Sequence, residues 1–454
     1  MTTGLRIGLV VAIGGVLAAP LAARVLRRRF DPFEPIVLFA LAYGMMFVVR
    51  PAAMLAEHHL AWEGSHGPTE VSGTFSKMLA LALVGAVAFV AAYETPVGRR
   101  LVSGWRGLGE LATPRVIAVA LVTGGLGVAS FVAFLVFSSD GLSSLALIFR
   151  GRSEELSKDV AGTTFYLWYS FFLLVPATLV LVAVGLERRR KALVLAGLAF
   201  GALFLLRTVP LGARIAMLPL FGGAFVFFYL RRSRRPSVVV LVGLALVALL
   251  GSAFLSDLRA RGTRGESVAQ TVVRATRPHW IVSQLVSGPD TEMAPVLAAA
   301  LTRIPQKLHY TYGRTIFGDL VARPIPRALW SDKPEPPRDK LIDSLWPLER
   351  KKDGINPEFS VLLYFFWDFG IPGVVAGMFL FGVGARALFE YFQNYRHSSA
   401  AQLLYALALW FIVIGLRNSP VDTFVQLVFV VLPAWLAVRL SEWRGVRFAP
   451  AVSR

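Results

Sequence analysis

The sequence predicts an all-α membrane protein, a polytopic bundle of about eleven transmembrane helices with a long, partly helical external loop capping its outer face. Of the 454 residues, 56% are hydrophobic and only 17% are charged, and the mean hydropathy is +0.61. Soluble domains carry roughly 25% charged residues. Apolar runs of about 20 residues, the length that crosses the hydrocarbon core as a helix, recur along the whole chain. A membrane β-barrel would show alternating segments of about 10 residues instead.

The apolar runs divide the chain into three parts. Residues 1–255 hold about eight spans, residues 256–357 form the external loop, and residues 358–454 hold about three spans. Within the loop, helical stretches are expected at Val268–Val273 and Ala294–Leu301. The spans are expected at residues 5–23, 34–56, 77–93, 115–137, 164–186, 192–206, 212–230, 237–255, 358–385, 400–416 and 421–438.

Arginine clusters beside the apolar runs indicate the orientation. A net charge of +19 and a pI of about 10.7 would suggest nucleic-acid binding in a soluble protein, but these residues flank spans and follow the positive-inside rule. All clusters are cytoplasmic if the N-terminus is outside and the C-terminus is cytoplasmic. The first cluster follows an apolar run, which is a stop-transfer pattern rather than a signal peptide. The clusters are Arg24 to Arg29, Arg99 to Arg115, Arg188 to Lys191, Arg231 to Arg235 and Arg439 to Arg447.

The external loop mixes cations with aromatic residues. Aromatic rings stack on sugar faces and cations hold diphosphate groups, so this mixture predicts binding of an anionic glycan. The alternative is an amphipathic segment at the membrane interface, with Trp at the headgroups and Lys or Arg reaching toward water. The candidate substrate-binding residues are Arg303, Tyr310, Tyr312, Arg314, Trp330 and Lys333, and Arg327 lies in a turn bracketed by prolines.

Arg207 and Arg214 flank the short external connection RTVPLGAR. Arginines on the outer side oppose the positive-inside bias, so they need another reason. Paired guanidinium groups can clamp phosphate oxygens in a bidentate manner, and the alternative is that they reach to lipid headgroups. Arg417 is a third arginine in an external turn, where it binds substrate or bridges to Asp422 as a structural ion pair.

Three carboxylates are candidates for a general base. Glu358 stands at the outer end of the ninth span, where the alternative is a first-turn acid favoured by the helix dipole. Asp368 lies deeper, beside Gly370 and Pro372, which should break or kink the helix; a buried polar anchor is the other reading of Asp368. Glu57, in the first external loop, is a further alternative base.

No metal or cofactor is predicted. The adjacent histidines of the first external loop point apart and show no zinc spacing, so we expect no metal site there. The chain has no cysteine, which excludes disulfides and thiolate ligands. It also lacks a phosphate-binding P-loop, a dinucleotide fingerprint and a serine-elbow motif.

Three segments resemble a known family. They are GAR at 212–214, IPRALWSDKP at 325–334 and YFFWDFGIPGVVAG at 364–377. Over roughly residues 200–390 the chain resembles the Wzy-type O-antigen polymerases, and PR-x-x-W-x-x-KP is the most specific part. The resemblance implies a bacterial inner-membrane enzyme, related to GT-C glycosyltransferases, that joins lipid-linked repeat units outside the membrane. It matches Arg207, Arg214, Arg327 and Lys333 to basic positions, and Asp368 and Gly370 to a polar-aromatic-Gly step.

Residues and resemblance together predict a membrane glycosyltransferase that polymerises polyprenyl-diphosphate-linked oligosaccharides. Arg214 and Arg327 would act on the departing diphosphate, and Glu358 would take the acceptor proton. Since no Asp-x-Asp pair is present, we expect the reaction to be independent of metal. Expected partners are the lipid-linked glycan, membrane lipids and a chain-length regulator protein, and not nucleic acid. The alternatives are an O-antigen-ligase-like or polyprenyl-phosphate-sugar transferase and a lipid-linked glycan transporter. The transporter is less favoured, because transporters often show two related halves and this sequence shows none.

Overall fold

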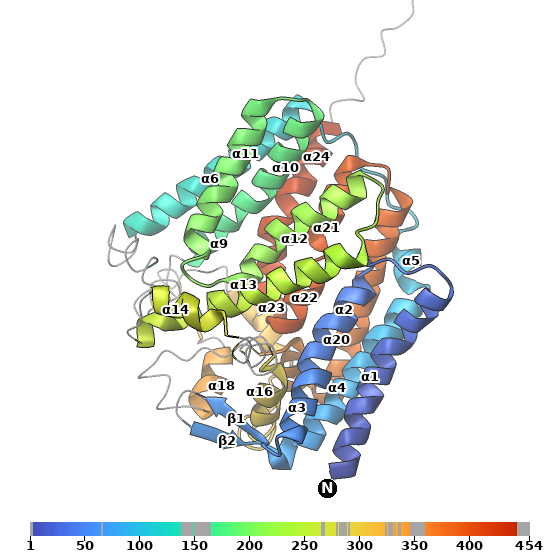
Figure 1. Cartoon of the computed structure of the whole chain (residues 1–454), viewed down its shortest axis with the longest axis vertical. Helices are drawn as coiled ribbons and strands as arrows, with labels where there is room; N and C mark the ends of the chain where they lie inside the picture. The colour runs from blue at the N-terminus through green and yellow to red at the C-terminus, as the bar shows by residue number, and fades with distance from the viewer. Residues whose placement is uncertain are drawn as a thin grey trace, which may run out of the picture.

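The protein is a helical bundle of membrane-spanning length (Figure 1). The computed structural model describes residues 3–64, 67–137, 148, 165–264, 268–277, 280, 288, 291–322, 325, 330, 332–334, 337–345 and 359–442. Within these ranges, ten helices are long and apolar enough to cross a bilayer. The chain is therefore a multi-pass membrane protein, and the predicted all-α class is confirmed.

The ten spans are built from single helices or from short helices joined end to end. They are α1 (Thr3–Leu26), α2 (Pro35–Gly44) with η1 (Met45–Val49) and α3 (Arg50–Ala56), α4 (Ser72–Glu94), α6 (Pro114–Phe137), α9 (Phe165–Ser170) with η3 (Phe171–Leu173) and α10 (Leu174–Glu187), α11 (Lys191–Thr208), α12 (Arg214–Arg231), α20 (Val361–Asn394), α21 (Ser399–Ala408) with α22 (Phe411–Arg417), and α23 (Pro420–Val430) with α24 (Leu432–Glu442).

The predicted span at 237–255 is not among the ten membrane-spanning helices of the described residues. Helix α13 (Val238–Arg264) forms there and continues past the predicted loop boundary at residue 256. Its apolar section, Val238–Ser252, is too short to count with the ten spans. In Figure 1 α13 crosses the front of the bundle obliquely, and Val238, Val239 and Val247 on it are exposed. It is a peripheral helix rather than a core one.

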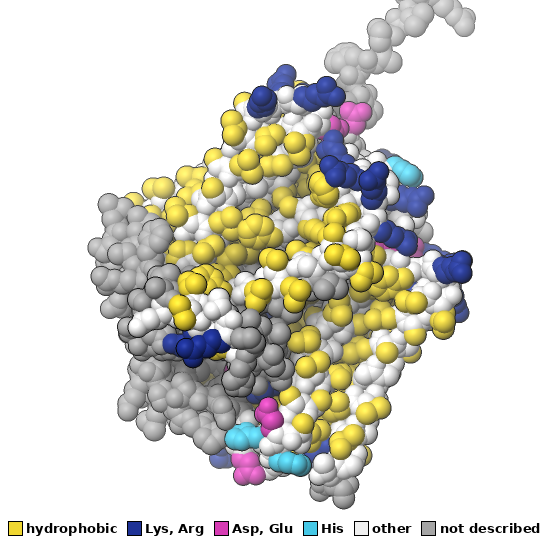
Figure 2. All heavy atoms as spheres, viewed as in Figure 1, with side chains coloured by type: hydrophobic (Ala, Val, Ile, Leu, Met, Phe, Trp, Pro, Cys, Tyr) yellow, Lys and Arg dark blue, Asp and Glu magenta, His cyan; other side chains and the backbone are white. Residues whose placement is uncertain are grey.

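The two ends of the bundle differ in charge. One end, called here the basic end, carries the arginine clusters that flank the spans and the short helix α5 (Val97–Val102). The other, the loop end, carries the N-terminus and the long loop (Figure 1). Figure 2 shows Lys and Arg side chains gathered at the basic end above a belt of hydrophobic side chains.

An ion-pair cluster ties helices together at the basic end. Arg24 of α1 donates to Glu34 and to Glu94 of α4, with nitrogen–oxygen distances of 2.8 Å in both pairs. Arg386 of α20 lies 3.9 Å from the same Glu34 carboxylate and also pairs with Glu390. Buried Glu34 thus joins α1 and α20, and Arg24 extends the cluster to α4.

The hydrophobic core has two parts. The first lies among α1, α2, η1, α4 and α20, where the rings of Phe39 and Phe89 stack with centroids 3.5 Å apart. The second lies among α6, η3, α10, α11, α12 and α21 to α24, where Phe392 and Tyr405 stack with centroids 4.2 Å apart. Contacts of α20 with α21 and α22, and of α2 with α22, join the two parts.

The long loop contributes to the first core. Its described helices are α14 (Val268–Ala275), α16 (Met293–Ala300), η4 (Arg314–Gly318), α17 (Asp319–Ala322) and α18 (Pro337–Leu345), so a partly helical loop is confirmed. All of α16 is buried, and the hydroxyl of Thr74 in α4 donates to the Ala298 carbonyl at 2.6 Å. Beside it lies an antiparallel pair of strands, β1 (Ala61–Gly64) and β2 (Gly67–Glu70), which the sequence pattern did not predict.

Candidate functional site

Several predicted site residues lie at one level of the bundle. At 1.5 Å per residue, Arg207 and Arg214 lie about 24 and 26 Å along their helices from the basic end. By the same measure Arg417 and Asp368 lie about 27 Å along their spans from Ser399 and Arg386. The hydrocarbon core of a bilayer is about 30 Å thick. In a bilayer whose hydrocarbon core begins at the basic end, all four residues would lie near the boundary of that core at the loop end.

An aromatic cage holds Arg207. The centre of its guanidinium lies 3.5 Å from the ring centroid of Trp168 and 4.5 Å from that of Phe171. Its Nη1 donates to the Trp168 carbonyl at 3.2 Å, and only 4% of the residue is exposed. Its buried Nε has no hydrogen-bond acceptor, and no carboxylate pairs with it, among the described residues. Among the residues that the structure describes, the cage therefore holds a cation that no anion pairs with.

Two further predicted arginines belong to helices that neighbour the elements of the cage. Arg214 begins α12, which packs against α11, and its Nη1 donates to the hydroxyl and carbonyl of Ser252 in α13 at 2.8 and 3.1 Å. Arg417, 7% exposed, ends α22. The next helix, α23, packs against α9 and η3, which form the cage. Arg207, Arg214 and Arg417 thus belong to neighbouring elements of the second core.

Helix α20 breaks where the sequence predicted a kink. Phe369 has φ −137° and ψ 15°, and Gly370 has φ 66° and ψ −150°. The latter conformation is essentially restricted to glycine. The break leaves two carbonyls free to bond elsewhere: Trp367 O accepts from Thr311 N–H and Asp368 O from Tyr312 N–H, both at 3.0 Å. The long loop is fastened to the break in α20.

Asp368 strengthens this fastening. The residue is 0% exposed, and its Oδ1 accepts from the Thr311 hydroxyl and, at 3.1 Å, from Thr315 N–H. A carboxylate that accepts from the first turn of η4 is favoured by the helix dipole. Its Oδ2 and the Thr315 hydroxyl have no hydrogen-bond partner among the described residues. These contacts support the reading of Asp368 as a buried polar anchor.

Three of the predicted loop residues belong to the segment that is fastened to the break: Tyr310, Tyr312 and Arg314. Tyr310 packs edge-on against Phe366 with ring centroids 5.9 Å apart, and its hydroxyl oxygen would lie 3.4 Å from a Cβ added at Gly370. Tyr312, at φ 49°, is exposed in the turn that precedes η4. Arg314 is exposed at the start of η4. The Tyr310 side chain thus lies beside the break in α20, and the Tyr312 backbone is bonded to it.

The remaining described candidates of the loop lie in turns. The Lys333 ammonium donates to the Ile325 carbonyl at 3.0 Å, and Lys333 N–H donates to the Trp330 carbonyl at 3.1 Å. Lys333 therefore helps to close the proline-bracketed turn, and Trp330 is exposed beside it. Arg303 follows α16, and its buried Nε has no acceptor in the described part of the chain.

Within the described part of the chain, the structure shows no side-chain hydrogen bond or ion pair for three other predicted site residues, Glu358, Arg327 and Glu57. Glu358 and Arg327 fall outside the described residues, so their positions stay predictions. Glu57 is exposed at the end of α3, at the loop end.

Within the described ranges, no group of three or more His, Asp or Glu side chains could hold a metal ion.

Sequence reasoning missed the partners that position the charged residues. Trp168 and Phe171 precede Arg207 by more than one span, and Thr311 and Thr315 belong to the loop. The aromatic run YLWYSFF at 166–172 was the available signal for a cage. Nothing in the sequence paired it with Arg207.

Comparison of the chain with protein-family profiles, with curated proteins and with solved structures found no match. The resemblance to the Wzy-type polymerases remains an expectation.

Proposed function

We propose that this protein is a glycosyltransferase of the bacterial inner membrane that polymerises polyprenyl-diphosphate-linked oligosaccharide repeat units. The loop end would face outward and the C-terminus the cytoplasm, since the arginine clusters gather at the basic end and positive charge favours the cytoplasmic side. The substrate diphosphate would then meet the arginines at the outer boundary of the hydrocarbon core.

The observation that carries the proposal is the buried guanidinium of Arg207. Burying an unpaired ion costs several kcal/mol, and contact with aromatic faces returns about 2 kcal/mol. The Trp168 and Phe171 rings thus hold the cation in place without neutralising it. An anionic ligand would supply the missing charge, and a diphosphate at the membrane boundary has that charge and that depth. Ionisable groups within a membrane are functional candidates for this reason.

In the proposed reaction, a hydroxyl of one lipid-linked glycan attacks the anomeric carbon of another, and the bond from that carbon to the diphosphate oxygen breaks. The diphosphate leaves with the bonding electron pair, and its growing negative charge is stabilised by fixed cations. Arg207 and Arg214 are the described candidates, and Arg327 is the predicted third. Glu358 would accept the hydroxyl proton. Asp368 would hold Tyr310, Tyr312 and Arg314 beside the break in α20 rather than act as the base.

The test is synthesis by the purified protein in proteoliposomes that contain a lipid-linked oligosaccharide repeat unit from the native host. A ladder of products that differ by one repeat unit is expected. Addition of a single block would indicate a ligase or a sugar transferase and would overturn the polymerase proposal. Recovery of unchanged substrate by a stably folded protein would also contradict it.

A companion test uses deletion in the native host. Loss of long surface glycan, with single repeat units accumulating on the lipid, is expected. Glycan of unchanged length distribution would be incompatible with a polymerase. Accumulation of long glycan on the lipid would indicate a ligase instead.

A further inference from the structure

An apolar surface runs from η4 and α17 onto α20 at the loop end. Phe317 and Val321 stand four residues apart and are 62% and 69% exposed. Thr315 and Ala322 of the same segment are buried. A soluble loop seldom leaves two large apolar side chains together in water, and such patches mark contact sites for proteins or membranes.

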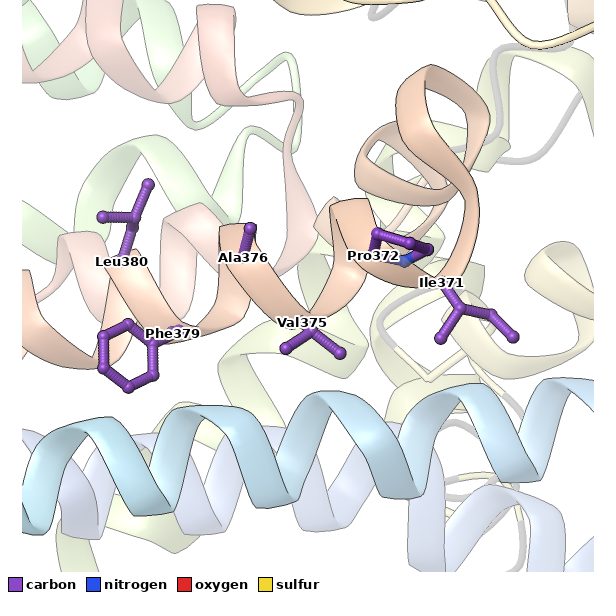
Figure 3. Close-up of a pocket in the computed structure, with 6 residues that line it drawn as sticks. All are labelled: Ile371, Pro372, Val375, Ala376, Phe379 and Leu380. Carbon is purple, nitrogen blue, oxygen red and sulfur yellow. The ribbon is translucent and has the colours of Figure 1, made fainter.

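This patch continues onto α20. A Cβ added at Gly313 would lie 3.0 Å from the Phe317 ring and 3.2 Å from the Phe369 ring, so both rings border Gly313. Phe369 is exposed, and a groove of about 550 Å³ begins two residues after it. Figure 3 shows its side chains on successive turns of α20, next to the break. The groove is lined by Ile371, Pro372, Val375, Ala376, Phe379 and Leu380.

The depth of this surface follows from the helix geometry. Arg386, in the ion-pair cluster, marks the basic end of α20, and Gly370 lies about 24 Å from it at 1.5 Å per residue. A hydrocarbon core of about 30 Å would therefore extend to or beyond the break. The Thr311–Trp367 and Tyr312–Asp368 hydrogen bonds hold the loop at that level. A tilt of α20 would bring the break deeper still.

We propose that this surface, consisting of Phe317, Val321, Phe369 and the six groove residues, contacts hydrocarbon chains of bilayer lipids. Segments η4 and α17 then form a re-entrant anchor in the leaflet at the loop end, and the groove receives a lipid chain. The inference does not depend on the proposed function.

Lipid, rather than a protein, is the occupant because the surface continues the lipid-facing side of a membrane-spanning helix. Ile371, Val375 and Leu380 are exposed on α20 within the hydrophobic depth. The lining of the groove carries no charged or hydrogen-bonding side chain that a protein partner could use for recognition. Arg314, in the same segment, is exposed, and a long arginine side chain at the membrane boundary can reach the lipid headgroups.

The absence of cysteine from the chain makes a direct test simple. Phe317→Cys, Val321→Cys and Val375→Cys are each labelled with a nitroxide and reconstituted in nanodiscs of phosphatidylethanolamine and phosphatidylglycerol. Collision with oxygen reports lipid exposure, and collision with a water-soluble nickel chelate reports water exposure. Val132→Cys is the lipid control, because Val132 is exposed about 27 Å along α6 from Pro114, at a matching depth. Lys307→Cys, exposed on the same loop, is the water control.

The proposal expects the oxygen-to-nickel collision ratio at 317, 321 and 375 to match that at 132 and to exceed that at 307 several-fold. Ratios at 317 and 321 that match position 307 would place the loop in water and overturn the proposal. Occlusion from both reagents would indicate a second copy or another protein on the surface, which also overturns it. Thermal stability equal to that of the parent verifies folding, and Val321→Cys serves alone if Phe317→Cys does not fold.

Discussion

Replacing Arg207 by Met should separate its contribution to activity from its contribution to stability. The substitution removes one hydrogen bond to the Trp168 carbonyl and the contacts with the Trp168 and Phe171 rings. Together these contribute about 3 kcal/mol to the free energy of unfolding. No carboxylate pairs with Arg207 in the described part of the chain, and the substitution also removes the cost of burying such an ion, which is several kcal/mol. We therefore expect the stability to be unchanged or to rise by up to about 2 kcal/mol.

The activity should change in the opposite direction. A fixed charge that stabilises a departing anion commonly contributes about 3–4 kcal/mol to the transition state. The rate of glycan polymerisation should therefore fall roughly 10²- to 10³-fold in Arg207→Met. Arg207→Lys keeps a positive charge but loses the planar group that stacks on the rings. Its polymerisation rate should therefore lie between that of the parent and that of Arg207→Met.

Arg232→Met is the matched control. Its guanidinium centre also lies over an aromatic ring, 4.0 Å from the Phe228 centroid, but it is exposed at the basic end. It should leave both rate and stability near the parent values. Rates come from product ladders in proteoliposomes, and stability from thermal unfolding in detergent. A normal rate combined with a loss of more than about 2 kcal/mol of stability in Arg207→Met would refute the reasoning, because the cation would then be structural.

Four further predictions test other parts of the molecule. Asp368→Ala should lower the free energy of unfolding by about 1.5–3 kcal/mol and loosen the loop, because two hydrogen bonds to a carboxylate are lost. The rate of hydrogen exchange of the amides at 311–315 should rise. An unchanged exchange rate would contradict the role of Asp368 as an anchor of the loop. Gly370→Ala should cost about 1–3 kcal/mol in thermal unfolding, since φ 66° and ψ −150° strain an alanine; an alanine variant as stable as the parent would mean that the break relaxes. Burial raises the pKa of Asp31 above its ordinary 3.8, although the Phe33 N–H and the Arg235 charge act to lower it. The stability that this carboxyl contributes is thus present below its unfolded pKa and lost as the pH rises through its higher folded pKa. The melting temperature of Asp31→Asn should equal that of the parent near pH 3 and exceed it at pH 7. Equal melting temperatures of variant and parent at both pH values would contradict this prediction. Turnover should persist in EDTA, and activity that EDTA abolishes and a divalent ion restores would disprove metal independence.

Most of the bundle could be predicted, because the thickness of the bilayer determines how many consecutive apolar residues a membrane-spanning helix needs. A span needs about 20 apolar residues, which a single sequence shows directly. The break at Gly370 was predictable for a similar local reason, since Gly370 and Pro372 interrupt a helix whatever surrounds them. Helix α13 shows the limit of this reasoning: its residues are apolar, but its position outside the core depends on the packing of other helices.

The site was less predictable because its geometry joins distant segments. The sequence singled out Arg207 because an arginine on that side of the membrane is unusual. It could not show that Trp168 and Phe171 would enclose the guanidinium, because cation–π contact depends on how α9 and η3 pack against α11. Asp368 was proposed both as an anchor and as a base, and only the contacts with Thr311 and Thr315 favour the anchor. The apolar run of α16 predicted a helix, but which elements would enclose it depends on packing that the sequence does not show.

The interior position of α16 restricts how the protein could admit a large molecule. Helix α16 is enclosed by α3, α4, α18 and α20, and the Thr74 hydroxyl bonds to its backbone. Withdrawing it would return eight buried residues to solvent, and each buried Val or Leu among them contributes about 1.5–3 kcal/mol. Helix α16 should therefore stay in place when a ligand enters or leaves the protein. We expect a bulky ligand to pass beside α16 rather than through the space that this helix fills.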